Sequence, residues 1–272
     1  MVAAKLICCL NTILLMKTIA EVKKSKGKKK IAMLSLYDAM FAAHANNVDI
    51  DLLLVGDSVS NVLLGYDSTK RIGMKEMEIF TKAVANAKPD CMIIGDMPYK
   101  SYENKKSALE NAKKFLNAGA NAVKVEGDKA EIVKHLVKNR IPVMGHVGLL
   151  PQSAKKIRVH GKEEKEAQKI LAEAISLEKA GCFSIVLESM PTKLAKKITS
   201  ALKIPTIGIG AGKYCDGQVL VAHDLLGINP HEFKPKFVKH FAKLSPAIEK
   251  AFAKFRKEVV KGKYPSAKYS YH

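Results

Sequence analysis

Short runs of consecutive apolar residues recur along the whole chain, and each is followed by a turn and a segment with helical spacing. The runs are continuous rather than alternating, which is typical of strands covered on both faces, as in a parallel sheet. The eight predicted strands are Ile31–Leu36, Asp51–Val55, Cys91–Gly95, Asn121–Val125, Ile141–Gly145, Phe183–Leu187, Ile204–Ile209 and Gln218–Val221.

The segments between these strands have the spacing and composition of helices. Clear examples are Lys75–Ala87, Asn104–Ala118, Glu163–Ala180 and Lys193–Leu202. Eight strands alternating with helices predict an α/β fold, the (β/α)8 TIM barrel. A doubly wound open sheet is the alternative, because periodicity alone does not show that the sheet closes.

No low-complexity linker divides the chain, so we expect a single catalytic domain over residues 16–272. Residues 1–15 are interpreted as an N-terminal extension or a start-site artefact, because Met16 opens a plausible start. The basic segment Pro235–Tyr264 is predicted to be a helical tail that packs on the outside of the barrel or against a neighbouring subunit.

Polar side chains end five successive predicted strands. They are Asp57, Asp96, Glu126, His146 and Glu188. A lone Asp after a strand would more often cap the next helix. In a barrel, however, the carboxyl ends of all strands meet on one face, where catalytic residues lie. Five polar ends in order therefore indicate a common site.

Asp57, Asp96 and Glu126 are hard oxygen donors from adjacent strands. With no thiolate and no H-x-x-E-H arrangement beside them, they favour Mg²⁺ or Mn²⁺ over zinc, with water and a chelating substrate completing the coordination. The alternative for each carboxylate is a helix cap or an ion pair with a lysine.

Three further residues have more than one interpretation. Lys124 is two residues before Glu126, so both side chains point to the same side of the strand. Lys124 is either a counter-ion or, as we favour, a binder of an anionic substrate. His146 is either a hydrogen-bonded core residue or a participant in proton transfer. Glu188 follows an apolar strand, which favours a base, although ligation of a metal stays open.

Composition excludes several classes of protein. The chain has 272 residues, 47% of them hydrophobic, and its longest apolar stretch is too short for a membrane span. The formal net charge is +20, but the lysines are scattered, so we expect a solvated surface and no specific nucleic-acid binding. Gly208-Ile-Gly-Ala-Gly212 lacks the spacing of a dinucleotide loop, so NAD is not expected.

The five cysteines are scattered and include no C-x-x-C pair. An odd, dispersed set argues against a disulfide framework and for a reducing compartment, so we expect a cytoplasmic protein.

The chain contains a long, ordered series of motifs that resembles the ketopantoate hydroxymethyltransferase family (3-methyl-2-oxobutanoate hydroxymethyltransferases). The resemblance runs from about Met16 to the C-terminal Tyr-His. The motifs are Gly56-Asp57-Ser58, Gly65-Tyr-Asp-Ser-Thr69, Gly95-Asp96-Met-Pro98, Val123-Lys-Val-Glu-Gly127, Gly145-His-Val-Gly148, Pro151-Gln-Ser153, Leu187-Glu-Ser189, Pro205-Thr-Ile-Gly-Ile-Gly-Ala-Gly212 and Cys215-Asp-Gly-Gln-Val-Leu-Val221.

This resemblance implies a (β/α)8 barrel that assembles into a homo-oligomer, typically a decamer. It implies Mg²⁺-dependent transfer of a one-carbon unit from 5,10-methylenetetrahydrofolate, or a related pterin, to 3-methyl-2-oxobutanoate. The product is 2-dehydropantoate, on the route to pantothenate and coenzyme A.

The resemblance also assigns residues. Asp57, Asp96 and Glu126 fall on the family's metal positions, and Asp57, Ser58, Asp96 and Lys124 on its oxoacid-binding positions. Glu188 falls on the proton acceptor and His146 on a further active-site position. Chelation of a 2-oxo acid would polarise the ketone and favour its enolate.

The chain departs from the family pattern at a few positions. Ser60, Leu150 and Ser189 stand where the family usually has Gly, Thr and Cys, and the segment after Ser153 is shorter than usual. None of the proposed ligands is changed.

Three rival functions remain. A lyase or mutase of the phosphoenolpyruvate mutase/isocitrate lyase type would share the fold, but its nucleophilic cysteine loop has no counterpart here. A non-catalytic scaffold would have no need of the acidic set, and a nucleic-acid binder would rest on charge alone.

Overall fold

The computed structural model of the chain describes residues 18–153, 158–228 and 235–271. Its eight strands are all parallel and follow one another around a closed barrel in the order β1 to β8. The predicted (β/α)8 barrel is therefore confirmed, and the open-sheet alternative is excluded.

All eight predicted strands are present, displaced by a few residues at most. The strands are β1 (Ile31–Ser35), β2 (Leu52–Val55), β3 (Met92–Asp96), β4 (Ala122–Glu126), β5 (Val143–Gly148), β6 (Ser184–Glu188), β7 (Thr206–Ile209) and β8 (Gly217–Val221). Every residue of β2, β3 and β4 is buried, which explains why these strands are apolar apart from Asp96, Lys124 and Glu126.

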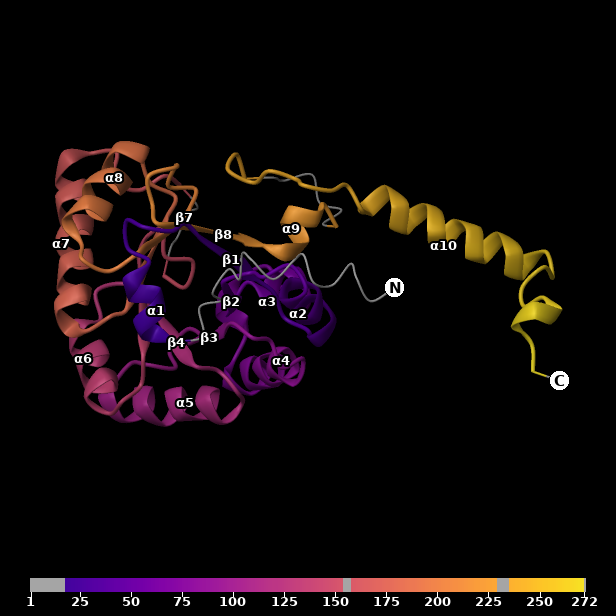
Figure 1. Ribbon diagram of the computed structural model, residues 1–272, viewed down its shortest axis with the longest axis horizontal. Helices are drawn as coiled ribbons and strands as arrows, with labels where there is room; N and C mark the ends of the chain where they lie inside the picture. Colours follow the sequence, from indigo (N-terminus) through magenta and orange to yellow (C-terminus); the bar gives the residue numbers. More distant parts are fainter. Residues whose placement is uncertain (1–17, 154–157, 229–234, 272) are drawn as a thin grey trace, which may run out of the picture. The chain divides into compact units, whose positions relative to one another are not determined.

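Helices lie outside the strands, as Figure 1 shows for α4 to α8. The barrel helices are α2 (Ala39–Asn46), α3 (Val59–Val62), α4 (Met74–Asn86), α5 (Lys105–Asn117), α6 (Ala130–Lys138), α7 (Glu164–Ala180) and α8 (Thr192–Ala201), with a 3-10 turn, η3 (Thr69–Arg71). The four helices predicted by range correspond to α4, α5, α7 and α8.

The inward face of the barrel changes from apolar to polar along the strands. Alternate residues such as Met33, Leu54 and Ile94 form the apolar core that fills the interior. Continuing the same alternation toward the carboxyl ends brings Asp96 and Lys124 to the inward face. The barrel is thus a packed core with a polar layer at its C-terminal end.

A short helix, α1 (Ile19–Lys24), closes the opposite end of the barrel. Its Val22 is fully buried in the interior cluster, beside the first inward residues of the strands. The turn that follows is held because Lys26 Nζ lies 2.8 Å from Asp216 Oδ2, just before β8.

The residues from Val221 onward form a second compact unit, described here by itself. It contains α9 (Ala222–Leu226), α10 (Ser245–Val260) and a 3-10 turn, η4 (Ala267–Tyr269). The predicted helical tail over Pro235–Tyr264 is helical only in α10. The preceding stretch instead bonds to the end of α9, for example Phe241 N–H to the Leu225 carbonyl at 2.8 Å.

Two predictions concern residues that the structure does not describe. The N-terminal extension at residues 1–15 and the start of the shortened segment after Ser153 lie outside the described residues. Within the described residues, none of the helices has the length and apolar character that crossing a membrane requires.

Candidate active site

Six of the predicted site residues form one connected group at the C-terminal ends of the strands, here called the strand-end cluster. Its members, which come from β2 to β6, are Asp57, Asp96, Lys124, Glu126, His146 and Glu188. All are buried except Glu188, whose side chain is 16% exposed. The prediction that these residues meet at one end of a barrel is confirmed.

The acidic end of the cluster is joined by Lys124. The Asp57 backbone N–H donates to Asp96 Oδ2 at 3.2 Å. Lys124 Nζ lies 2.7 Å from Asp96 Oδ1 and 3.7 Å from Glu126 Oε1. Lys124 and Glu126 therefore do share the inward face of β4, and one ammonium group faces more than one carboxylate.

His146 connects this group to Glu188. Its Nδ1 lies 3.4 Å from Glu126 Oε1, and its Nε2 lies 3.1 Å from Glu188 Oε2. Burial and the nearby Lys124 lower the pKa of His146, but hydrogen bonds to Glu126 and Glu188 outweigh them and raise the pKa to about 9. An imidazolium at neutral pH would donate to both carboxylates.

The carboxylates have strongly perturbed pKa values. Burial, followed by repulsion from Asp96 and Glu126, raises the pKa of Asp57. Burial also raises the pKa of Asp96, against the attraction of Lys124. For Glu126, burial is outweighed by the hydrogen bond to His146 and by Lys124, so its pKa is lowered. Burial lowers the pKa of Lys124, but Asp96 and Glu126 more than compensate and raise it. The site concentrates negative charge where water is scarce.

Ser58 lies beside the cluster rather than within it. Its Oγ is 2.7 Å from the hydroxyl of the fully buried Tyr37. The predicted oxoacid-binding serine is thus held next to Asp57 by a hydrogen bond with a residue that the sequence analysis did not single out.

The backbone around Glu188 is tightly packed. Leu149 N–H donates to the Glu188 carbonyl at 2.9 Å, and Ser189, the next residue, has a φ of 47°. Gly148 has a φ of 101°, and a Cβ there would overlap the Glu188 carbonyl. The loop after β5 can approach Glu188 because position 148 is glycine.

Sequence reasoning missed two buried polar residues at the site, Gln152 and Tyr102. Gln152 donates to the carboxylates of both Asp57 and Glu126. Tyr102 donates to Gln152 at 2.6 Å. Both lie in loops without a periodic pattern. The only signal for Gln152 was its place in the Pro151-Gln-Ser153 motif.

The donor chemistry fits a hard divalent cation. Three carboxylates lie near one lysine, and burial together with repulsion between acids raises the pKa values of Asp57 and Asp96. Over the described parts of the chain, no three acidic, His or Cys side chains could hold a metal ion by themselves. Mg²⁺ is usually bound by one or two carboxylates together with water and substrate oxygens, so the site agrees with that mode of binding.

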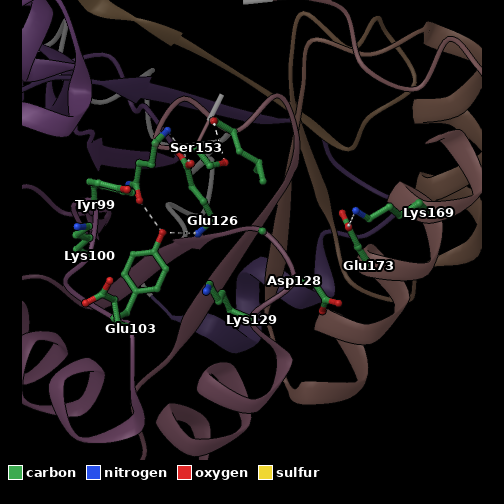
Figure 2. A pocket seen from close by; sticks show the side chains of 13 residues that line it. Tyr99, Lys100, Glu103, Glu126, Asp128, Lys129, Ser153, Lys169 and Glu173 are labelled. Atoms are coloured by element: carbon green, nitrogen blue, oxygen red, sulfur yellow. Dashed lines mark hydrogen bonds and ion pairs between the residues drawn. The ribbon is translucent and has the colours of Figure 1, made fainter. Parts of the chain in front are cut away.

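A pocket of about 410 Å³ opens beside Glu126. Figure 2 shows Tyr99, Lys100 and Glu103 on one side of it and Asp128, Lys169 and Glu173 on the other. Gln152 and Tyr102 also line it, so this pocket and the strand-end cluster share a wall.

The glycine-rich segment after β7 serves close packing. A Cβ at Gly212 would overlap the Thr192 side chain, and Gly212 has a φ of 79°. The segment can therefore pack against Thr192 because position 212 is glycine.

A closed parallel barrel that brings buried acids and bases together at the carboxyl ends of its strands is typical of enzymes of the (β/α)8 class. The model of the ketopantoate hydroxymethyltransferase family matches residues 16–267. The chain belongs to this family, as the motifs indicated.

Close relatives support the assignment. The 3-methyl-2-oxobutanoate hydroxymethyltransferase of Thermotoga maritima is 49% identical over 259 residues, covering 93% of this chain and 96% of that protein. The enzyme of the same name from Ignicoccus hospitalis is 47% identical, covering 91% and 95%.

Solved structures with the same fold come from a different group of enzymes. A phosphonopyruvate hydrolase superposes with a TM-score of 0.65 at 14% identity, covering 93% of each chain. A 2,3-dimethylmalate lyase of the phosphoenolpyruvate mutase/isocitrate lyase superfamily superposes with a TM-score of 0.60, also at 14% identity, covering 92% of each. These likenesses show the shared barrel. The rival lyase or mutase function is not supported, because the relatives of high identity are transferases.

Proposed function

We propose that the protein transfers a hydroxymethyl group from 5,10-methylenetetrahydrofolate, or a related pterin, to 3-methyl-2-oxobutanoate, giving 2-dehydropantoate for pantothenate and coenzyme A synthesis. The observation that carries this proposal is the buried cluster of Asp57, Asp96, Lys124 and Glu126. His146 connects Glu126 of this cluster to Glu188. Family membership supplies the reaction.

The oxoacid is bound in this proposal by Asp57, Ser58, Asp96 and Lys124. Lys124 is the cation nearest the acids, and its pKa is raised, so it stays charged. Its ammonium can neutralise the substrate carboxylate or the oxygen that becomes negative when the enolate forms. Ser58 offers a hydroxyl held in place by Tyr37.

Asp57, Asp96 and Glu126 would hold Mg²⁺ or Mn²⁺. When bound, the cation would act as a Lewis acid toward the oxygens of the oxoacid. The presence of three carboxylates near a single ammonium group supports cation binding, since a divalent ion would relieve the repulsion that Asp57 experiences from Asp96 and Glu126.

Glu188 is the proposed base that removes the proton from C3 of the oxoacid. It is the most exposed acid of the cluster, and it keeps a hydrogen-bonding neighbour in His146 at 3.1 Å. The C3–H electron pair enters the enolate, whose carbon attacks the methylene carbon carried by the pterin. Water supplies the hydroxyl oxygen, the bond between the methylene carbon and the pterin nitrogen breaks, and the tetrahydropterin leaves with a proton on that nitrogen. His146 orients Glu188 and, as an imidazolium, can share its proton.

The pocket beside Glu126 is the proposed site for the pterin donor. Its volume of about 410 Å³ lies in the range of small-molecule sites. The pocket offers donors and acceptors to a pterin ring, because three lysines and four acids line it together with Tyr99, namely Lys100, Lys129, Lys169, Glu103, Glu126, Asp128 and Glu173. The shared wall with the cluster would bring the methylene carbon near the enolate.

The assembly is proposed to be a homo-oligomer, a decamer by the family resemblance. Helix α10 supports contact with a second copy, because Phe252, Phe255 and Val260 are exposed in the single chain. A reducing, cytoplasmic location is part of the proposal, and Cys91, Cys182 and Cys215 are free thiols.

Hydrogen–deuterium exchange at C3 of 3-methyl-2-oxobutanoate tests the chemistry without the pterin. With Mg²⁺ or Mn²⁺ in D₂O, we expect the purified protein to exchange the C3 proton, as followed by NMR. Glu188→Gln should reduce the exchange rate by about 100-fold or more while oxoacid binding stays within a few-fold of wild type.

Two results would contradict this proposal. Absence of both exchange and condensation in the intact protein would remove the assigned reaction. Equal losses of binding and exchange in Glu188→Gln would reassign Glu188 to ligation or structure. Glu173→Gln is the matched control, because Glu173 lies in the pocket but outside the strand-end cluster. It should exchange at the wild-type rate.

A further inference from the structure

The side chain of Gln152 is buried at the centre of the site, yet neither the motifs nor the proposed reaction gives it a role. It lies in the loop after β5, at the wall between the strand-end cluster and the pocket of Figure 2. Within the described parts of the chain, its polar atoms take part in four hydrogen bonds.

The amide group of Gln152 has one orientation that satisfies all its neighbours. Its Nε2 donates to Asp57 Oδ2 and to the Met97 carbonyl, each at 2.9 Å. Its Oε1 accepts a 2.6 Å hydrogen bond from the Tyr102 hydroxyl. A flipped amide would place Oε1 against two acceptors, so the surroundings specify the orientation.

The backbone of Gln152 contacts a second carboxylate, that of Glu126. Its N–H donates to Glu126 Oε2 at 3.2 Å, and the Glu126 N–H donates to the Tyr102 hydroxyl at 3.3 Å. Glu126, Tyr102 and Gln152 therefore form a closed ring of hydrogen bonds. Through this ring one residue reaches the carboxylates of Asp57 and Glu126 at the same time.

We propose that Gln152, oriented by Tyr102, is a positioning residue that sets the relative placement of the Asp57 and Glu126 carboxylates for a divalent cation and the oxoacid. The inference rests on the proposed function. Like-charged carboxylates repel one another, and a brace is needed to hold them close together. The Gln152 side-chain amide holds Asp57 and its backbone N–H holds Glu126, and this neutral residue adds no positive charge to the one that Lys124 already supplies.

The test measures cation affinity directly. Mn²⁺ is titrated into the full-length protein with and without 3-methyl-2-oxobutanoate, and bound ion is followed by electron paramagnetic resonance. Gln152→Leu keeps the approximate volume but removes the amide, and it should weaken Mn²⁺ binding by about 10- to 100-fold. Tyr102→Phe removes only the hydroxyl, and it should weaken binding by a smaller factor in the same direction.

Kinetics provide a second readout that a purely structural role would not change. In C3 exchange assays, Gln152→Leu should raise the Mn²⁺ concentration for half-maximal rate more than it lowers the rate at saturating Mn²⁺. The matched control is Gln168→Leu, the same substitution on the exposed face of α7, where Gln168 bonds only Glu164 among the described contacts. It should leave both quantities at wild-type values.

The outcomes distinguish failure of the proposed function from failure of the positioning role of Gln152. If wild-type protein fails to bind Mn²⁺ and to exchange the C3 proton, the proposed function is refuted. If wild type binds and Gln152→Leu binds equally well, or loses stability without losing affinity, the positioning role is refuted. Should Gln152→Leu not fold, Tyr102→Phe decides: unchanged Mn²⁺ affinity overturns the proposal, and weakened affinity supports it.

Discussion

Replacing Lys124 by methionine would leave Asp57, Asp96 and Glu126 buried together without their ammonium partner. The substitution keeps an unbranched side chain of similar length in the packed end of the barrel. Its main effect is therefore the removal of one positive charge from a site where the side chains of Lys124 and Asp96 are 5% and 2% exposed.

The expected cost follows from the two distances to Lys124 Nζ. With an effective dielectric constant of about 20, an ion pair at 2.7 Å is worth about 6 kcal/mol and one at 3.7 Å about 4.5 kcal/mol. Desolvation of the charges offsets much of this attraction in the intact site. Removing one partner of a buried pair costs about 3–5 kcal/mol, because the remaining charge is left uncompensated.

The loss of stability caused by Lys124→Met should increase with pH. Burial and mutual repulsion already hold the pKa values of Asp57 and Asp96 above their unfolded values. Stability from such groups is present below the unfolded pKa and is lost as the pH rises through the folded pKa. Without Lys124 the pKa values of Asp57 and Asp96 rise further. The free energy of unfolding of the variant should therefore approach that of the wild type in acid and differ most from it near pH 8.

Scanning calorimetry in metal-free buffer with chelator, at equal protomer concentration, measures this difference. At pH 8 the Tm of Lys124→Met should fall by on the order of 10 °C. The control is Lys105→Met, whose partner Glu131 is 3.1 Å away and exposed. Exposed ion pairs contribute little, so its Tm should not change measurably. Equal Tm values for the two variants, or a loss at pH 8 no larger than at pH 5, would refute the reasoning.

Two other predictions concern the loops around the site. Hydrogen bonding to Arg158, with further bonds from the Gly161 N–H and His160, lowers the pKa of Glu166 to about 2 from 4.5. Glu166→Gln should therefore lower the Tm by a few degrees at neutral pH. The difference in Tm between wild type and variant should disappear as the pH falls from about 4.5 toward 2. A difference in Tm that does not depend on pH would contradict this prediction. Gly148→Ala should reduce C3 exchange by about 100-fold, because the new Cβ displaces the Glu188 backbone. Gly27→Ala, at a glycine that also has a positive φ but no atom within 4 Å of the new Cβ, should exchange normally.

The strands could be predicted from sequence because strands that are buried on both faces consist mainly of consecutive apolar residues. Asp96 and Glu126 were visible for the same reason, since each is the polar end of an apolar run. Their meeting at one site followed from the geometry of parallel strands in a barrel.

The residues that sequence reasoning missed lie where no periodicity exists. Gln152 and Tyr102 are polar residues in loops, and polar loop residues are usually solvated. Their burial results from contacts between segments far apart in the chain, such as Tyr102 with Gln152. The start of α10 was misplaced for a similar reason. The segment before Ser245 bonds to the carbonyls of α9, a pairing that helical spacing does not encode.

Closure of the N-terminal end by α1 has a consequence for the order of events in the proposed reaction. Among the described residues, Val22 and the apolar cluster fill the interior below the site, so we expect both substrates to enter past the carboxyl ends of the strands. In the proposed reaction the keto acid would occupy the deeper position, and the pterin would bind above it at the same opening. Turnover should therefore be sequential, with the keto acid first on and its elongated product last off.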